Sequence, residues 1–304
     1  MKKEKREFLI FLAVGYGLPF LMAIPMYFLF QQGKNVGSFP TAQALFPAAG
    51  VILAKLICEK GSPLLPKKFF IGFLILTAYM VLQCFNGFLP GNLALPNLAM
   101  VGSIVLMFLF FAEKKEAIHA HGLNGNRWKL SGLLQNFSPG YLPFILLGIF
   151  TLFTYFLGEE YGWRYYLQPR LQNKFGPIKG VLLLGVVWEF WHLPLVLLFY
   201  APELRGVTLV QFMLLRYVNC IALSIFMAYA YLRTHNVWVP VSIHFLNNNL
   251  LALFYQENAA TVPAGTEYAW AQVGVTILIQ AAVYCPFLFS KVFRRPKENL
   301  PQEP

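Results

Sequence analysis

Three short motifs place ionisable and amide side chains inside otherwise apolar stretches of this sequence. In the run GEEYGWRYYLQPRL, Glu159 and Glu160 follow a long apolar stretch, and Arg164 comes four residues after Glu160. Residues four apart share one face of an α-helix, so Glu160 and Arg164 can neutralise each other and leave Glu159 as a general base. The alternative is that both acids cap an interfacial turn while Arg164 reaches the lipid headgroups.

The second motif, VVWEFWHLPL, lies in the middle of an apolar segment. It sets Glu189 three residues and Trp188 four residues before His192. Ionisable side chains at such depth usually face the interior of a helix bundle and mark a functional path. We expect Pro194 to break the helix just past His192 and to free backbone groups that line a hydrated cavity. The alternative is a core histidine bonded to a neighbouring carbonyl.

The third motif, PVSIHFLNNNLL, places His244 and Asn248 one helical turn apart. Imidazole and amide donors on one helix face suit the oxyanion that develops when a carbonyl group is attacked. A single intramembrane asparagine is more often a hydrogen-bonding contact between helices. Taken together, the three motifs predict a water-activating site with a glutamate base, an orienting partner and oxyanion donors.

Other hydrolytic chemistries have less support. The sequence has neither a GxSxG nucleophile elbow nor an HExxH zinc motif. A zinc alternative remains, because two histidines and one glutamate form a known catalytic zinc set: His192 and His244 with Glu159 or Glu189. The cysteines show no CxxC spacing and are interpreted as small apolar residues: Cys58, Cys84, Cys220 and Cys285.

The composition predicts that helices in a membrane carry these motifs. Of the 304 residues, 58% are hydrophobic and 12% are charged, with a mean hydropathy of +0.56. A helical span needs about 20 apolar residues, and a spanning backbone must satisfy its own hydrogen bonds. We therefore predict an all-α, polytopic transmembrane bundle of about eight spans in the cell membrane. Its nine apolar segments are 8–30, 39–57, 69–88, 94–111, 141–157, 181–200, 209–232, 237–255 and 269–289.

The net charge of +11 comes from short basic runs beside the apolar segments, such as Lys2, Lys3, Lys5 and Arg6. Such runs indicate topology and contact with anionic lipid, and no nucleic-acid-reading motif accompanies them. Both termini are basic and favour the cytoplasm, which requires an even number of spans. We expect the segment ending at Glu159 to be tilted or only partly inserted. The predicted domains are N-terminal transmembrane helices (1–112), a polar extramembrane linker (113–140), a catalytic helical core (141–290) and a basic polar tail (291–304).

At these motifs the sequence resembles the CPBP family of CAAX proteases and bacteriocin-processing enzymes, relatives of the type II CAAX prenyl endopeptidases. The family pattern EExxxR corresponds to Glu159, Glu160 and Arg164. The pattern FxxxH corresponds to Trp188 and His192, with Trp in place of the usual Phe, and HxxxN corresponds to His244 and Asn248. The resemblance covers about residues 140 to 255.

The resemblance implies a metal-independent glutamate endopeptidase without a cofactor. Glu159 and His192 would activate water, while His244 and Asn248 would hold the oxyanion. Glu160, Arg164 and Trp188 would support them. Glu189 is an additional candidate, because it is an acid beside the site that the family pattern does not include.

The sequence leaves the substrate open between a peptide and a membrane protein, prenylated or not. A non-catalytic alternative is a bacteriocin-immunity or other membrane-binding protein, which would keep its cellular effect after Glu159→Ala. A transporter is less favoured, because we find no inverted repeats with paired broken helices.

Overall fold

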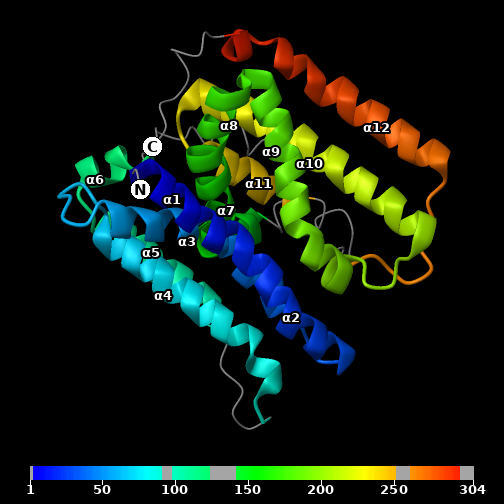
Figure 1. The fold of residues 1–304 in the computed structure, drawn as a ribbon, viewed down its shortest axis with the longest axis horizontal. Helices are drawn as coiled ribbons and strands as arrows, with labels where there is room; N and C mark the ends of the chain where they lie inside the picture. Colours follow the sequence, from blue (N-terminus) through cyan, green and yellow to red (C-terminus); the bar gives the residue numbers. More distant parts are fainter. Residues whose placement is uncertain (1–2, 91–97, 124–141, 251–260, 295–304) are drawn as a thin grey trace. The chain divides into compact units, whose positions relative to one another are not determined.

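The computed structural model describes residues 3–90, 98–123, 142–250 and 261–294, and all regular secondary structure in these ranges is helical (Figure 1). Each of the nine predicted apolar segments contains a helix within the described residues. The predicted all-α class is therefore confirmed. The end of the 113–140 linker and most of the 291–304 tail lie outside the described residues.

Six helical runs among the described residues are long and apolar enough to cross a membrane. A seventh apolar helix, Ala99–Phe111, is shorter. This pattern confirms a multi-pass membrane protein, while the count of eight spans stays a prediction. The six runs are Lys3–Gln31, Ser38–Cys58, Lys67–Phe88, Pro177–Tyr200, Gly206–Thr234 and Trp270–Phe289.

The chain forms two compact units that interleave in sequence. The first unit is Met1–Gly162 with Asn236–Glu257, and the second is Trp163–His235 with Asn258–Pro304. Both units therefore contribute to the predicted catalytic core.

The first unit is built around α3 (Ser38–Cys58), the most buried of its long helices. Helix α3 packs against α1, α4 and α7, and α7 packs in turn against α5 and α11. Every residue of α3 from Ala42 to Ile52 is buried, as expected of a helix surrounded by other helices. The other helical segments of this unit are α1 (Lys3–Phe11), a π-helix (Leu12–Gly17), α2 (Leu18–Gln31), α4 (Lys67–Cys84), a 3-10 turn (Asn86–Phe88), α5 (Ala99–Phe111), α6 (Lys115–Ala120), α7 (Leu142–Glu160) and α11 (Trp238–Leu250).

A chain of ion pairs joins one end of α3 to α1 and to the turn after α6. The buried Lys55 ammonium lies 3.7 Å from Glu7 and 3.0 Å from Glu59. Burial alone would raise the pKa of the Glu59 carboxyl, but the hydrogen bonds and charges of Lys55 and Lys3 together outweigh it and lower that pKa. His121 lies 3.5 Å from Glu59, and burial lowers the pKa of this imidazole. These contacts link three segments far apart in sequence.

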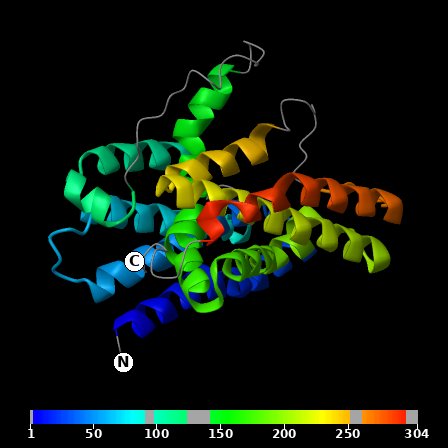
Figure 2. The same ribbon diagram turned by 90° about the horizontal axis from the view of Figure 1, so that it is seen from above.

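The second unit centres on α9 (Pro177–Leu195) and α10 (Gly206–Thr234), which pack along each other. Helix α8 (Gln168–Phe175) packs against α9. Helix α12 (Trp270–Tyr284) runs alongside α10 (Figures 1 and 2). The other helical segments described in this unit are two π-helices, Tyr161–Leu167, which begins in the first unit, and Val196–Tyr200, and two 3-10 turns, Cys285–Phe289 and Lys291–Arg294.

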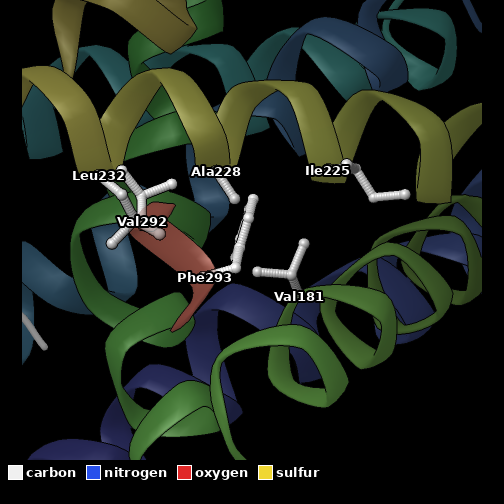
Figure 3. Packing of buried hydrophobic residues seen from close by; sticks show 6 residues of the cluster. All are labelled: Val181, Ile225, Ala228, Leu232, Val292 and Phe293. Carbon is white, nitrogen blue, oxygen red and sulfur yellow. The ribbon is translucent and has the colours of Figure 1, made fainter. Parts of the chain in front are cut away.

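An apolar cluster holds the 3-10 turn Lys291–Arg294 against α9 and α10. Side chains of α10 face Val181 of α9, and the ring of Phe293 lies among them (Figure 3). All members are nearly inaccessible to solvent, so the 3-10 turn Lys291–Arg294 is packed into the unit. The cluster consists of Val181, Ile225, Ala228, Leu232, Val292 and Phe293.

The prediction that Pro194 breaks the helix just past His192 is wrong. Helix α9 continues through Pro194 to Leu195 and passes directly into the π-helix Val196–Tyr200. The backbone N–H of Val196 bonds to the carbonyls of His192 and Leu193. A proline near the end of a helix removes one donor, and the wider π-type turn after it preserves the helical path.

Candidate active site

The sequence-predicted residues divide between the two compact units. The first unit carries the two adjacent acids and the HxxxN motif, and the second carries the arginine and the motif of α9. The first group is Glu159, Glu160, His244 and Asn248, and the second group is Arg164, Trp188, Glu189 and His192.

Two glycines set the position of the adjacent acids in the first unit. A Cβ added to Gly158 would collide with the carbonyl oxygen of Ala44, and one added to Gly162 would collide with Pro47. Glycine therefore lets α7 and the turn after it approach the backbone of α3 closely. As a result Glu159 is 8% exposed and Glu160 is fully buried at the end of α7.

The structure brings Glu160 together with His244, a residue 84 positions away in the chain. Their Oε1 and Nδ1 atoms are 2.9 Å apart, and both side chains are buried. The Phe156 ring meets the imidazole edge-on, with the ring centroids 5.0 Å apart. A carboxylate only accepts hydrogen bonds, so an ionised Glu160 orients His244 with the proton on Nδ1. In this tautomer Nε2 carries a lone pair when the His244 ring is neutral and a proton when the ring is protonated.

Asn248 lies one turn beyond His244 on α11, as the HxxxN spacing predicts. Its side chain is exposed, and its Oδ1 atom accepts a hydrogen bond of 2.9 Å from the amide of Asn247. This bond uses the oxygen of the Asn248 amide and leaves its NH₂ group to donate. An oxyanion needs such a donor.

A π-helix, Tyr161–Leu167, follows the two acids directly. Short π-helical turns are rare and occur frequently at functional sites. The Tyr161 hydroxyl donates a hydrogen bond of 3.1 Å to the carbonyl of His121. The acids are thus anchored on one side by α3 and on the other by the turn after α6. No sequence motif pointed to the contact with His121.

Arg164, in the second unit, is fully buried. Its guanidinium donates to the Ser224 hydroxyl at 3.1 Å and to the Met227 sulfur at 3.5 Å, both on α10. It also lies over the Trp188 ring, 5.1 Å from the centroid, so Trp188 provides an aromatic cation–π contact. The predicted neutralisation of Glu160 by Arg164 stays a prediction.

His192 is held by the helix that carries it. Its Nδ1 atom lies 3.0 Å from the carbonyl oxygen of Trp188, which requires a proton on Nδ1 and leaves the lone pair on Nε2. The Trp191 ring meets the imidazole edge-on at a centroid distance of 4.8 Å. The carbonyl contact anticipated for a core histidine is therefore present, and it fixes the tautomer that a base would need.

Glu189 has two partners that our sequence analysis did not identify. Arg216 binds both carboxylate oxygens, at 2.6 and 3.0 Å, and the Cys220 thiol donates to Oε2 at 3.2 Å. The signal for Arg216 was present in the sequence. It is the sole charged residue in the apolar segment 209–232, and intramembrane charges rarely occur without a function or a partner.

Among the described residues, Glu189, His192 and Cys220 bring three metal-ligating atoms within 4.8 Å of one another. This set differs from the zinc set considered from the sequence. It does not fit a zinc ion, because the Arg216 guanidinium already occupies both oxygens of Glu189 and would repel a divalent cation.

The fold and site define a multi-pass helical membrane protein with buried carboxylate–histidine pairs. Residues 141–250 match the family model described as type II CAAX prenyl endopeptidase Rce1-like. A segment of 61 residues is 34% identical to the CAAX prenyl protease 2 of Methanococcus maripaludis, covering 20% of this chain and 21% of that protein. The match thus spans about a fifth of the relative's length. The predicted resemblance is confirmed for this segment, and no solved structure matches the chain.

Proposed function

We propose that the protein is an intramembrane endopeptidase that hydrolyses a peptide bond of a membrane-associated protein or peptide with water activated by Glu159. The observation that carries this proposal is the buried Glu160–His244 pair directly beside Glu159, within the segment matching the endopeptidase family. A carboxylate and an oriented imidazole are the groups that general-base hydrolysis requires.

In the proposed reaction, Glu159 takes a proton from water as the hydroxide attacks the substrate carbonyl, and His192 orients that water through Nε2. Negative charge then develops on the carbonyl oxygen. The Asn248 amide and the Nε2–H of protonated His244 donate hydrogen bonds to it. When the carbon–nitrogen bond breaks, the proton held by Glu159 passes to the leaving amine.

Glu160 has a supporting role in this scheme. Its carboxylate stabilises a protonated His244 by a short, charge-assisted contact at 2.9 Å, so that both ring nitrogens donate. Arg164, in the π-helix before α8, and Trp188, on α9, support the second unit through their cation–π contact. Neither touches the reacting atoms in the proposal.

We propose a prenylated C-terminal peptide as the substrate class, because the matching family model and the matching relative are both named for CAAX prenyl proteases. In this proposal the prenyl chain contacts the apolar surfaces of the helices, and the peptide bond reaches the polar side chains of the proposed site. Cleavage of a farnesylated peptide over its unfarnesylated counterpart tests this class. Equal cleavage of both peptides would contradict it.

We further propose that the reaction proceeds without a metal ion. The occupation of Glu189 by Arg216 supports this, since it removes the carboxylate best placed to join a histidine and a thiol around a cation.

The direct test is cleavage of a quenched fluorescent, farnesylated peptide by purified protein in lipid vesicles. We expect Glu159→Gln and His192→Ala to fold and to lose nearly all turnover, since general-base catalysis contributes about 100- to 10,000-fold. The exposed Glu203→Gln variant is the matched control and should cleave as the parent does. Full cleavage by purified Glu159→Gln would remove the proposed base.

A further inference from the structure

Glu189 and Arg216 form a partly buried, two-pronged ion pair between α9 and α10. The Arg216 Nε and Nη2 atoms lie 2.6 and 3.0 Å from the two carboxylate oxygens, and the Glu189 side chain is fully buried. The guanidinium also lies over the Tyr200 ring, 4.9 Å from its centroid. Such a fork fixes the plane of the carboxylate as well as its position.

The fixed carboxylate lies against the imidazole of His192. Glu189 Oε2 is 3.7 Å from Nδ1, the same nitrogen that lies 3.0 Å from the Trp188 carbonyl. The Trp188 carbonyl accepts the hydrogen bond from Nδ1–H, and the Glu189 carboxylate, beyond hydrogen-bond distance, places a negative charge beside the same nitrogen. Both favour the proton on Nδ1 and the lone pair on Nε2. The Cys220 thiol donates to the same Oε2 atom, so Glu189 has three donors around it besides the ring.

We propose that Glu189, held by Arg216, is a positioning residue for His192: it keeps the ring proton on Nδ1 and, through its negative charge, strengthens Nε2 as the acceptor that orients the attacking water. The inference rests on the proposed hydrolysis. It gives a role to two residues that the family patterns do not specify: Glu189, at a variable position between Trp188 and His192, and Arg216 on α10. The arrangement resembles that of serine hydrolases, where a buried carboxylate orients the catalytic imidazole.

A purely structural role for the pair predicts something different. A buried ion pair that only joins two helices can be replaced by neutral partners of similar shape with little loss. A carboxylate that acts on His192 cannot be replaced in this way, because the amide of glutamine carries no charge. Removing both charges together therefore separates the two roles.

The experiment compares Glu189→Gln, Arg216→Gln and the double variant for thermal stability, kcat and KM in lipid vesicles. We expect Arg216→Gln to lower stability more, because it leaves the fully buried Glu189 carboxylate without its partner. Glu189→Gln should lower stability less, because the Arg216 side chain that it leaves is 23% exposed. The double variant should regain stability. Its kcat should stay about 10- to 100-fold below the parent with KM unchanged, a smaller loss than in serine hydrolases because the Trp188 carbonyl still holds Nδ1.

Arg233→Gln, an exposed arginine on the same helix, is the control and should change neither quantity. Recovery of parental kcat by the double variant would overturn the proposal and leave the pair as a structural contact. Parental kcat in Glu189→Gln alone would do the same.

A spectroscopic measurement keeps the test independent of turnover. Nitrogen-15 labelling of the histidine rings reports which nitrogen is protonated, and the His192→Gln variant identifies the signal. We expect the Nδ1–H tautomer in the parent and a detectable fraction of the Nε2–H form in Glu189→Gln. An Nε2–H ring in the parent would refute the inference. If His192→Ala instead cleaved normally, the proposed function would fail, whatever the tautomer.

Discussion

Replacing Glu160 with glutamine tests the buried pair at the end of α7 at nearly constant side-chain volume. Its carboxylate lies 2.9 Å from His244 Nδ1, and neither side chain is appreciably exposed. A hydrogen bond to a charged group contributes about 1.5–3 kcal/mol, and a neutral one about 0.5–1.5 kcal/mol. The glutamine oxygen can still accept, so the change costs the difference, about 1–2 kcal/mol.

If His244 donates to the oxyanion only when it is protonated, this cost falls on the transition state. At about 1.4 kcal/mol per tenfold in rate, kcat should fall about 5- to 30-fold while KM stays the same. Glu160→Ala removes the acceptor altogether and should also destabilise the first unit, by about 3–5 kcal/mol.

The assay is hydrolysis of the farnesylated peptide in lipid vesicles, at several substrate concentrations. A double-mutant cycle with His244→Gln completes it, because residues in direct contact give non-additive effects. Unchanged kcat in Glu160→Gln, or full additivity with His244→Gln, would refute the reasoning. Glu203→Gln again serves as the exposed control.

Three further predictions concern the fold and the cofactor. Gly158→Ala should destabilise the first unit by about 1–3 kcal/mol in thermal unfolding, because its Cβ would meet the backbone of α3, whereas Gly274→Ala on α12 has open space and should not. Burial lowers the pKa of His121, so the unfolded state binds more protons, and stability should fall as the pH drops below about 6.5, by at most about 1.4 kcal/mol per pH unit. His121→Asn should flatten that dependence and the exposed His119→Asn should not; a steep dependence in His121→Asn would contradict this assignment. Cleavage should persist in strong chelator, since Arg216 occupies Glu189; loss of activity restored by zinc would show a metal enzyme.

The helices could be predicted from the sequence because lipid imposes one solution on long apolar segments. Each predicted segment contains a helix, and the pattern needed no knowledge of tertiary contacts. The local winding of those helices, α or π, was harder to predict from the sequence. Counting residues by the α-helical period failed at Pro194, where a π-type turn follows α9. The chain also changes from α-helix to π-helix directly after Glu160. The rule that residues four apart share one α-helical face therefore does not carry over to Glu160 and Arg164.

The motifs identified residues of the right type, but their partners depended on long-range packing. His244 was predicted as an oxyanion donor because Asn248 lies one turn away on the same helix. Its carboxylate partner, Glu160, lies instead at the end of α7. No local pattern links positions so far apart in the chain. Arg216 was detectable as a lone charge in an apolar segment, yet only the packing of α9 on α10 assigns it to Glu189.

The pairing of Glu189 with Arg216 also bears on how the protein enters the bilayer during synthesis. On insertion scales, a single charged residue at the centre of a helix opposes transfer into lipid by about 2.5–3.5 kcal/mol. Because only residues 201–205 separate the π-helix after α9 from α10, the two segments can leave the translocation machinery as one hairpin with their charges already matched. Neither helix then has to enter the hydrocarbon core of the bilayer with an unpaired side-chain charge.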